Sequence, residues 1–137
     1  MDKFELKFSS EYHTVSIIIN DINLMDLIRN RDEMTGELSH NEHSELNIRY
    51  IVSALYYNDK DDFFEDDKQS ILGCCCGDKN CGPFRVKILE TDDTIIWTDF
   101  KSRFSEYFRT IAKLEFEKEQ YIEQVESLNK IMISDWG

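Results

Sequence analysis

Two runs of alternating apolar and polar side chains open the chain. Phe4, Leu6 and Phe8 alternate with charged residues, and residues 15–19 repeat the alternation with β-branched side chains after a polar stretch. A period of two is typical of a strand that buries one of its faces. Two such runs with turn residues between them predict a β-hairpin over residues 3–20.

Three other stretches have the 3.6-residue period of an amphipathic helix. The first begins at Leu24 and extends to about residue 33, and the second follows Ser44, a favourable N-cap residue, and extends to about Asn58. The third covers about residues 117–132. Its apolar positions fall at i, i+4, i+7 and i+11 and are Tyr121, Val125, Leu128 and Met132.

Between the second and third helices, residues 71–100 predict three short strands joined by tight turns. They hold all four cysteines and the only proline, and Leu114 and Phe116 suggest one more strand. At 137 residues, the chain has the length of one domain. The sequence therefore predicts a single α+β domain over residues 1–137. We expect an antiparallel sheet of about five to six short strands, with the C-terminal amphipathic helix packed on one face.

The formal net charge of −12 indicates which kinds of partner the protein can bind. Such a charge repels nucleic-acid phosphates and anionic membranes, and the lysines and arginines are scattered singly along the chain. We therefore expect neither nucleic acid nor membrane as a partner. No run approaches the roughly 20 apolar residues of a membrane span, and no signal-peptide pattern is present, so we expect a cytoplasmic protein. An acidic surface suits a basic protein partner.

Six acidic residues within residues 59–67 form the candidate partner-binding segment. They lack the spacing of an EF-hand calcium loop, and a solvated connection is the simpler interpretation of the same composition. The six residues are Asp59, Asp61, Asp62, Glu65, Asp66 and Asp67.

Three cysteines at C-x-C-x4-C spacing form the candidate metal site: Cys74, Cys76 and Cys81. Three converging thiolates can hold zinc, with His40, His43, Asp78 or water as the fourth ligand. The second cysteine pair of a typical structural zinc site is missing. Reduced, partly buried thiols in a bulged hairpin explain the same residues without metal. Thiol-dependent catalysis needs an activating base, which no neighbouring feature of the sequence identifies.

The cysteine segment also carries a longer pattern, L-x-C-x-C-G-x-x-x-C, from Leu72 to Cys81. Trp97 and Phe100 follow at W-x-x-F spacing, and Phe116 precedes Tyr121 by five residues. Over roughly residues 70–130 the chain resembles a family of small, uncharacterised bacterial proteins in which this motif precedes a V-x-W-x-x-F strand. Members often have a bulky residue where this chain has Gly82. The resemblance implies a bacterial, non-secreted α+β protein and no particular activity.

The sequence has no nucleophile-elbow, phosphate-binding-loop or H-E-x-x-H motif. We therefore expect a non-enzymatic cytosolic protein that acts by binding another protein, of the immunity or antitoxin class, without a cofactor. The alternatives are a small zinc-stabilised domain that uses the three cysteines and, in a different class, a thiol-dependent enzyme.

Overall fold

A computed structural model describes residues 1–27, 43–56, 68–74, 84–102 and 113–136 of the chain. Residues 24–27 are helical, and two further helices have defined bounds: α2 (Ile48–Leu55) and α3 (Lys118–Trp136). The strands are β1 (Phe4–Ser9), β2 (Thr14–Ile19), β3 (Ile22–Asn23), β4 (His43–Glu45), β5 (Gln69–Cys74), β6 (Phe84–Glu90), β7 (Thr94–Ser102) and β8 (Lys113–Glu117).

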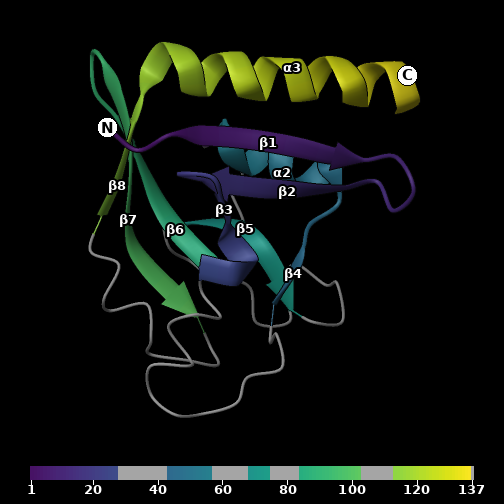
Figure 1. Ribbon diagram of the computed structural model, residues 1–137, viewed down its shortest axis with the longest axis horizontal. Helices are drawn as coiled ribbons and strands as arrows, with labels where there is room; N and C mark the ends of the chain where they lie inside the picture. The colour runs from purple at the N-terminus through teal and green to yellow at the C-terminus, as the bar shows by residue number, and fades with distance from the viewer. Residues whose placement is uncertain (28–42, 57–67, 75–83, 103–112, 137) are drawn as a thin grey trace.

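The described strands form two antiparallel sheets in which every strand pairs with its neighbour in sequence. One sheet has the order β1-β2-β3 and the other the order β4-β5-β6-β7-β8. Helix α3 lies along β1 and also contacts β7, β8 and α2, while α2 packs on β5 (Figure 1). The predicted α+β class, the antiparallel pairing and the packed C-terminal helix are confirmed. The strands are divided between two sheets, whereas the sequence suggested one.

Asp2 joins the two sheets at the point where they diverge. Its backbone N–H donates to the Glu115 carbonyl at 2.8 Å, and its Oδ2 accepts from the Glu115 N–H at 2.9 Å. Its Oδ1 accepts from Nδ2 of Asn20 at 3.0 Å. One residue thus continues the edge of β8 and also holds the turn after β2.

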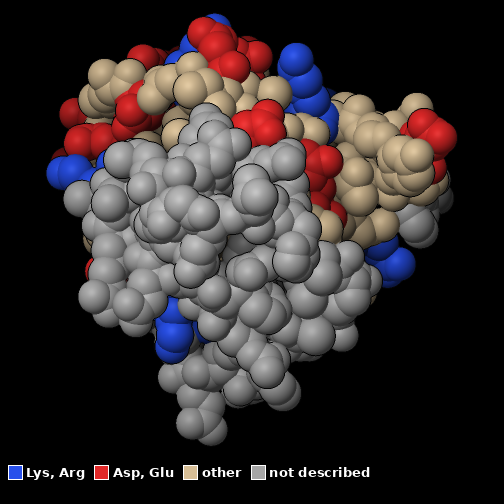
Figure 2. Space-filling view, turned by 60° about the horizontal axis from the view of Figure 1, so that its bottom comes forward, with Lys and Arg blue, Asp and Glu red and all other residues tan. Residues whose placement is uncertain are grey.

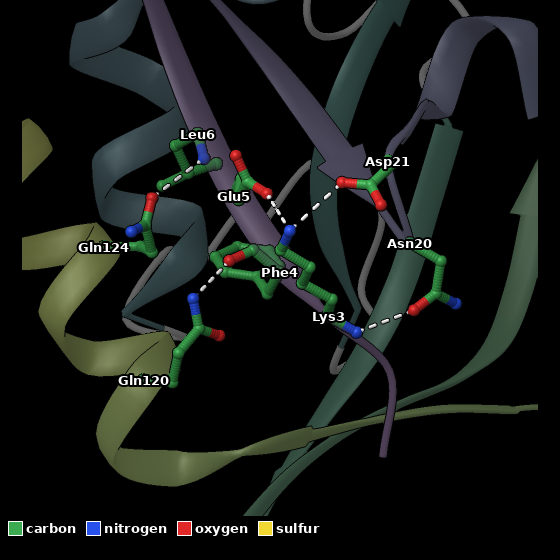
Figure 3. A network of polar contacts seen from close by, with 8 residues as sticks. All are labelled: Lys3, Phe4, Glu5, Leu6, Asn20, Asp21, Gln120 and Gln124. Atoms are coloured by element: carbon green, nitrogen blue, oxygen red, sulfur yellow. Dashed lines mark hydrogen bonds and ion pairs between the residues drawn. The ribbon is translucent and has the colours of Figure 1, made fainter.

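Beyond Asp2, helix α3 takes the place of a strand beside β1. Two glutamines of the helix bond the backbone of that strand: Gln120 donates to the Phe4 carbonyl, and Gln124 accepts from the Leu6 N–H at 3.0 Å (Figure 3). Four residues of a helix rise about 6 Å, and two residues of a strand rise about 6.8 Å. Helix side chains at i and i+4 are therefore spaced like the backbone N–H and C=O groups of every second strand residue, which point to the same edge. The glutamines thereby cover a sheet edge that would otherwise be open to another strand.

The core lies between the sheets and the two long helices. Four aromatic side chains that are fully buried meet at its centre: Phe4, Trp97, Phe116 and Tyr121. The Tyr121 hydroxyl donates to the Leu55 carbonyl at 2.7 Å, which satisfies its polar atom and fastens α3 to the end of α2. The apolar stripe predicted for the C-terminal helix accordingly faces the core, since Val125 and Leu128 are also buried.

The predicted helical start at Leu24 agrees with the helical residues 24–27, but the turn after the first hairpin leads first into a strand that the sequence did not predict. Asn20 and Asp21 have φ values of 53° and 68°, and Ile19 pairs with Ile22. Two residues with positive φ make a tight turn of the kind that joins antiparallel strands. A short third strand, β3, therefore precedes the helical residues 24–27.

The N-cap of the second helix is Asn47, and the prediction of Ser44 is wrong. Asn47 accepts from the Arg49 N–H at 2.9 Å. The residues before it are held in extended form, because the Leu46 carbonyl accepts from Val15 and the Ile48 N–H donates to His13. Ser44 consequently lies within β4.

Replacing Asp2 by alanine should destabilise the protein by about 1–3 kcal/mol, because a part-buried N–H of Glu115 loses its acceptor. Chemical denaturation of wild type and variant measures the difference. Asp26→Ala, at an exposed carboxylate, is the matched control and should change stability by less than about 0.5 kcal/mol. Equal effects of the two substitutions would contradict the role of Asp2 as a junction.

Candidate functional site

The turn between β6 and β7 is fixed to the first residue of α3. Thr91 and Thr94 bond each other, with the Thr94 N–H donating to Thr91 Oγ1 at 2.9 Å. The Lys118 N–H donates to the Asp93 carbonyl at 2.9 Å, and Lys118 Nζ lies 2.6 Å from Glu90 Oε2. Because these contacts link the turn and the helix start, the side chains of both elements keep a defined spacing.

A groove of about 680 Å³ lies where this turn meets the outer side of α3. Six of its eight lining residues are acidic, and we call these eight residues the acidic groove. They are Asp92, Asp93, Glu117, Lys118, Glu119, Ile122, Glu123 and Glu126. Six carboxylates therefore face a single ammonium group, which is itself paired with Glu90.

The arrangement follows from the periodicity of α3. Glu119, Glu123 and Glu126 fall at i, i+4 and i+7, so they share one side of the helix with the half-buried Ile122 between them. The opposite side carries the buried Tyr121 and Val125. In Figure 2 acidic side chains gather toward the upper part of the molecule, and basic ones are separated around its outline.

Among the residues that the structure describes, Tyr56 and Lys3 have perturbed pKa values. Burial raises the pKa of Tyr56, and the negative charge of Glu126 raises it further. Hydrogen bonds to Glu5 and Asp21 raise the pKa of Lys3, which is solvent-exposed. Glu126, which lines the acidic groove, therefore also acts on Tyr56, the C-cap residue of α2.

The acidic run predicted to bind a partner, residues 59–67, lies outside the described residues. Cys76, Cys81, His40 and Asp78 of the predicted zinc site lie outside them as well. Cys74 ends β5, and the register of β4 and β5 pairs its Cα with that of His43. The sheet thus brings the backbones of two predicted zinc ligands together, although they are 31 positions apart in sequence.

Within the described ranges, no group of three or more His, Cys, Asp and Glu side chains is arranged to hold a metal ion. No helix in this part of the chain is both long and apolar enough to cross a bilayer.

Comparisons with family models, with curated proteins and with solved structures find no match for this chain. The resemblance carried by the cysteine segment therefore stays a prediction.

The acidic groove was missed by sequence reasoning, which selected the densest acidic run. Its acids are spread over residues 92–126 and belong to a turn, a strand end and a helix. The available signal was the spacing of Glu119, Glu123 and Glu126 opposite the apolar stripe of α3. That spacing defines a helix face, but the contribution of the β6–β7 turn depends on tertiary contacts.

Glu126→Gln should lower the pKa of Tyr56 toward, but not to, its ordinary value of about 10, because burial still raises it. Alkaline absorbance titrations are recorded with and without Tyr56→Phe, both in wild type and in Glu126→Gln. The difference between the two curves of each pair gives the titration of Tyr56.

Because the folded-state pKa of Tyr56 is raised, the protonated phenol stabilises the fold fully below pH ~10. That contribution is lost as the pH rises through the folded-state value. A pKa of Tyr56 that is identical in both backgrounds would contradict the coupling.

Proposed function

We propose that this protein acts by binding a basic protein partner through the acidic groove, as a non-enzymatic protein of the immunity or antitoxin class. The observation that supports the proposal most directly is the set of six carboxylates on elements that are fastened to each other. A surface that is already ordered loses little conformational entropy on binding. A partner that presents lysines or arginines would meet complementary charge along about two turns of α3.

The overall charge supports the same class of partner. At −12, the protein attracts a cationic partner over long range, which raises the association rate, and the groove then fixes the site of contact. Toxins that act on nucleic acid are often basic, which is the reason for preferring the immunity or antitoxin class. In this proposal the protein works in the cytoplasm by occupying its partner, and its own side chains perform no reaction.

Reversing two charges of the groove, Glu119→Lys with Glu123→Lys, should abolish retention of the partner. An exposed ion pair contributes about 0.2–1 kcal/mol, and reversal adds repulsion at both positions, so the affinity should fall about tenfold or more. A pulldown from the native host at low salt measures how much partner is retained for each molecule of the bait protein.

The matched control is Glu11→Lys with Asp26→Lys, which changes the net charge equally at exposed acids outside the groove. It should retain the partner within about threefold, the change expected from net charge alone. If wild type recovers no stoichiometric basic protein, or if both double variants lose it equally, the proposal is wrong.

A second candidate function is that of a zinc-stabilised domain built on Cys74, Cys76 and Cys81. The pairing of His43 with Cys74 across β4 and β5 favours it, because directly opposite Cα atoms lie about 4.5–5.5 Å apart. The backbone pairing places His43, one of the proposed fourth ligands, beside Cys74.

This candidate predicts about one zinc per chain by elemental analysis and a lower melting temperature in the presence of a chelator. His43→Ala should weaken zinc binding by at least about tenfold, whereas His13→Ala, in the β1–β2 turn, should not. Metal-free protein whose melting is unaffected by chelator would exclude the zinc-stabilised domain.

A further inference from the structure

One apolar side chain lies among the charged residues of the acidic groove. Of the eight lining residues, Ile122 alone is apolar. It is half-buried, because part of it packs against the core while the rest faces the groove. An isoleucine in this position leaves apolar surface in water, and a ligand that covers the surface gains free energy. The groove therefore offers an apolar contact as well as negative charge.

The contacts of α3 fix the position of Ile122 relative to both walls of the groove. Its neighbour Tyr121 is fully buried, and the Tyr121 hydroxyl donates to the Leu55 carbonyl at 2.7 Å. The hydrogen bond from the Lys118 N–H to the Asp93 carbonyl keeps the β6–β7 turn beside the start of the helix (Figure 1). A ligand thus meets an apolar group and carboxylates that are already arranged, which lowers the entropic cost of binding.

Carboxylates flank Ile122 along the axis of α3. Glu119 precedes it by three residues and Glu126 follows it by four, and residues at these spacings lie on one side of a helix. At 1.5 Å per residue, the two glutamates are about 4.5 and 6 Å from Ile122 along the axis, or about 10.5 Å from each other. The groove therefore presents an apolar group between two negative ones.

The complement of this arrangement is an apolar side chain between two basic ones at the same spacing. A helix with lysines or arginines three or four positions before and after an apolar residue matches it, since its spacing is that of α3 itself. In an extended strand, residues of one face are about 6.8 Å apart. Basic residues on both sides of an apolar one would then be about 13.6 Å apart, farther than the two glutamates.

We propose that the acidic groove binds an amphipathic basic helix of its partner, and that Ile122 determines this specificity by contacting an apolar side chain between two ion pairs. The inference rests on the proposed function, because it states the chemistry of the same basic partner. A net charge of −12 attracts any polycation and selects none. Covering Ile122 also removes water from the adjacent carboxylates, which strengthens their ion pairs with a partner of this one arrangement.

Two synthetic peptides of identical composition test the inference. Both are alanine-rich, have about 16 residues, which is long enough to form a helix, and carry lysines at i−4, i−3, i+3 and i+4. The facing peptide has its leucine at i, between the lysines, and the reversed peptide has it at i+2, on the other side of the helix. Circular dichroism checks that the two are equally helical. NMR titration of the full-length protein at low salt, followed at the Glu123 amide in the groove, gives both dissociation constants.

The facing peptide should bind wild type about threefold to tenfold more tightly than the reversed peptide, because only its leucine covers Ile122. Ile122→Ala should remove this preference. Ile131→Ala, at an exposed isoleucine of the same helix that does not line the groove, is the matched control and should keep it. Equal affinities of the two peptides for wild type, or a preference that persists in Ile122→Ala, would overturn the role of Ile122.

The comparison of the two peptides in wild type needs no substitution, so it decides the question even if Ile122→Ala fails to fold. The reversed peptide tests the proposed function separately, since it presents the same lysines. If both peptides shift the Glu123 signal with equal affinity, the groove binds cations and only the inference about Ile122 is wrong. If neither peptide shifts it, the inference and the proposed function both fail.

Discussion

The structure depends on the direct passage of β8 into α3. Glu117 ends the strand and Lys118 begins the helix, so no loop separates them. The helix must therefore start at the edge of the five-stranded sheet, where a further strand would otherwise pair. Asp2 occupies one position of that edge, and β1 then follows the helix, bonded by Gln120 and Gln124. The division into two sheets, the cover over β1 and the position of the acidic groove all follow from this junction.

Repeating local patterns could be predicted from the sequence. The first hairpin and the C-terminal helix were anticipated because alternation and 3.6-residue spacing depend only on near neighbours. The helix was expected over about 117–132, and in the structure it begins at Lys118 and extends to Trp136. Strand β4 was missed because three residues are too few to show a period, and β3 because a turn with positive φ at Asn20 and Asp21 has no glycine to mark it.

The charged surfaces could not be predicted in the same way, because each is assembled from distant residues. Basic residues that are single in the sequence are brought opposite each other by strand pairing, as Arg85 and Lys101 are. The acidic groove likewise needs the hydrogen bond between Lys118 and Asp93, which joins positions 25 apart. A one-residue change in the register of β6 and β7 would turn Lys87 toward the core. The position of a charged side chain on the surface therefore depends on the register of the strands.

The hydrogen bonds of Asp2 and of β1 also determine the order in which the fold can be completed. Asp2 bonds Glu115, 113 positions later, and Leu6 bonds Gln124, 118 positions later. On a ribosome the first hairpin emerges early, yet the groups that cover its outer edge are made only when α3 has been translated. Contacts of such long range slow folding, and an uncovered strand is prone to pair with other chains. The nascent protein therefore passes through a period of exposure to aggregation that ends when its last helix docks.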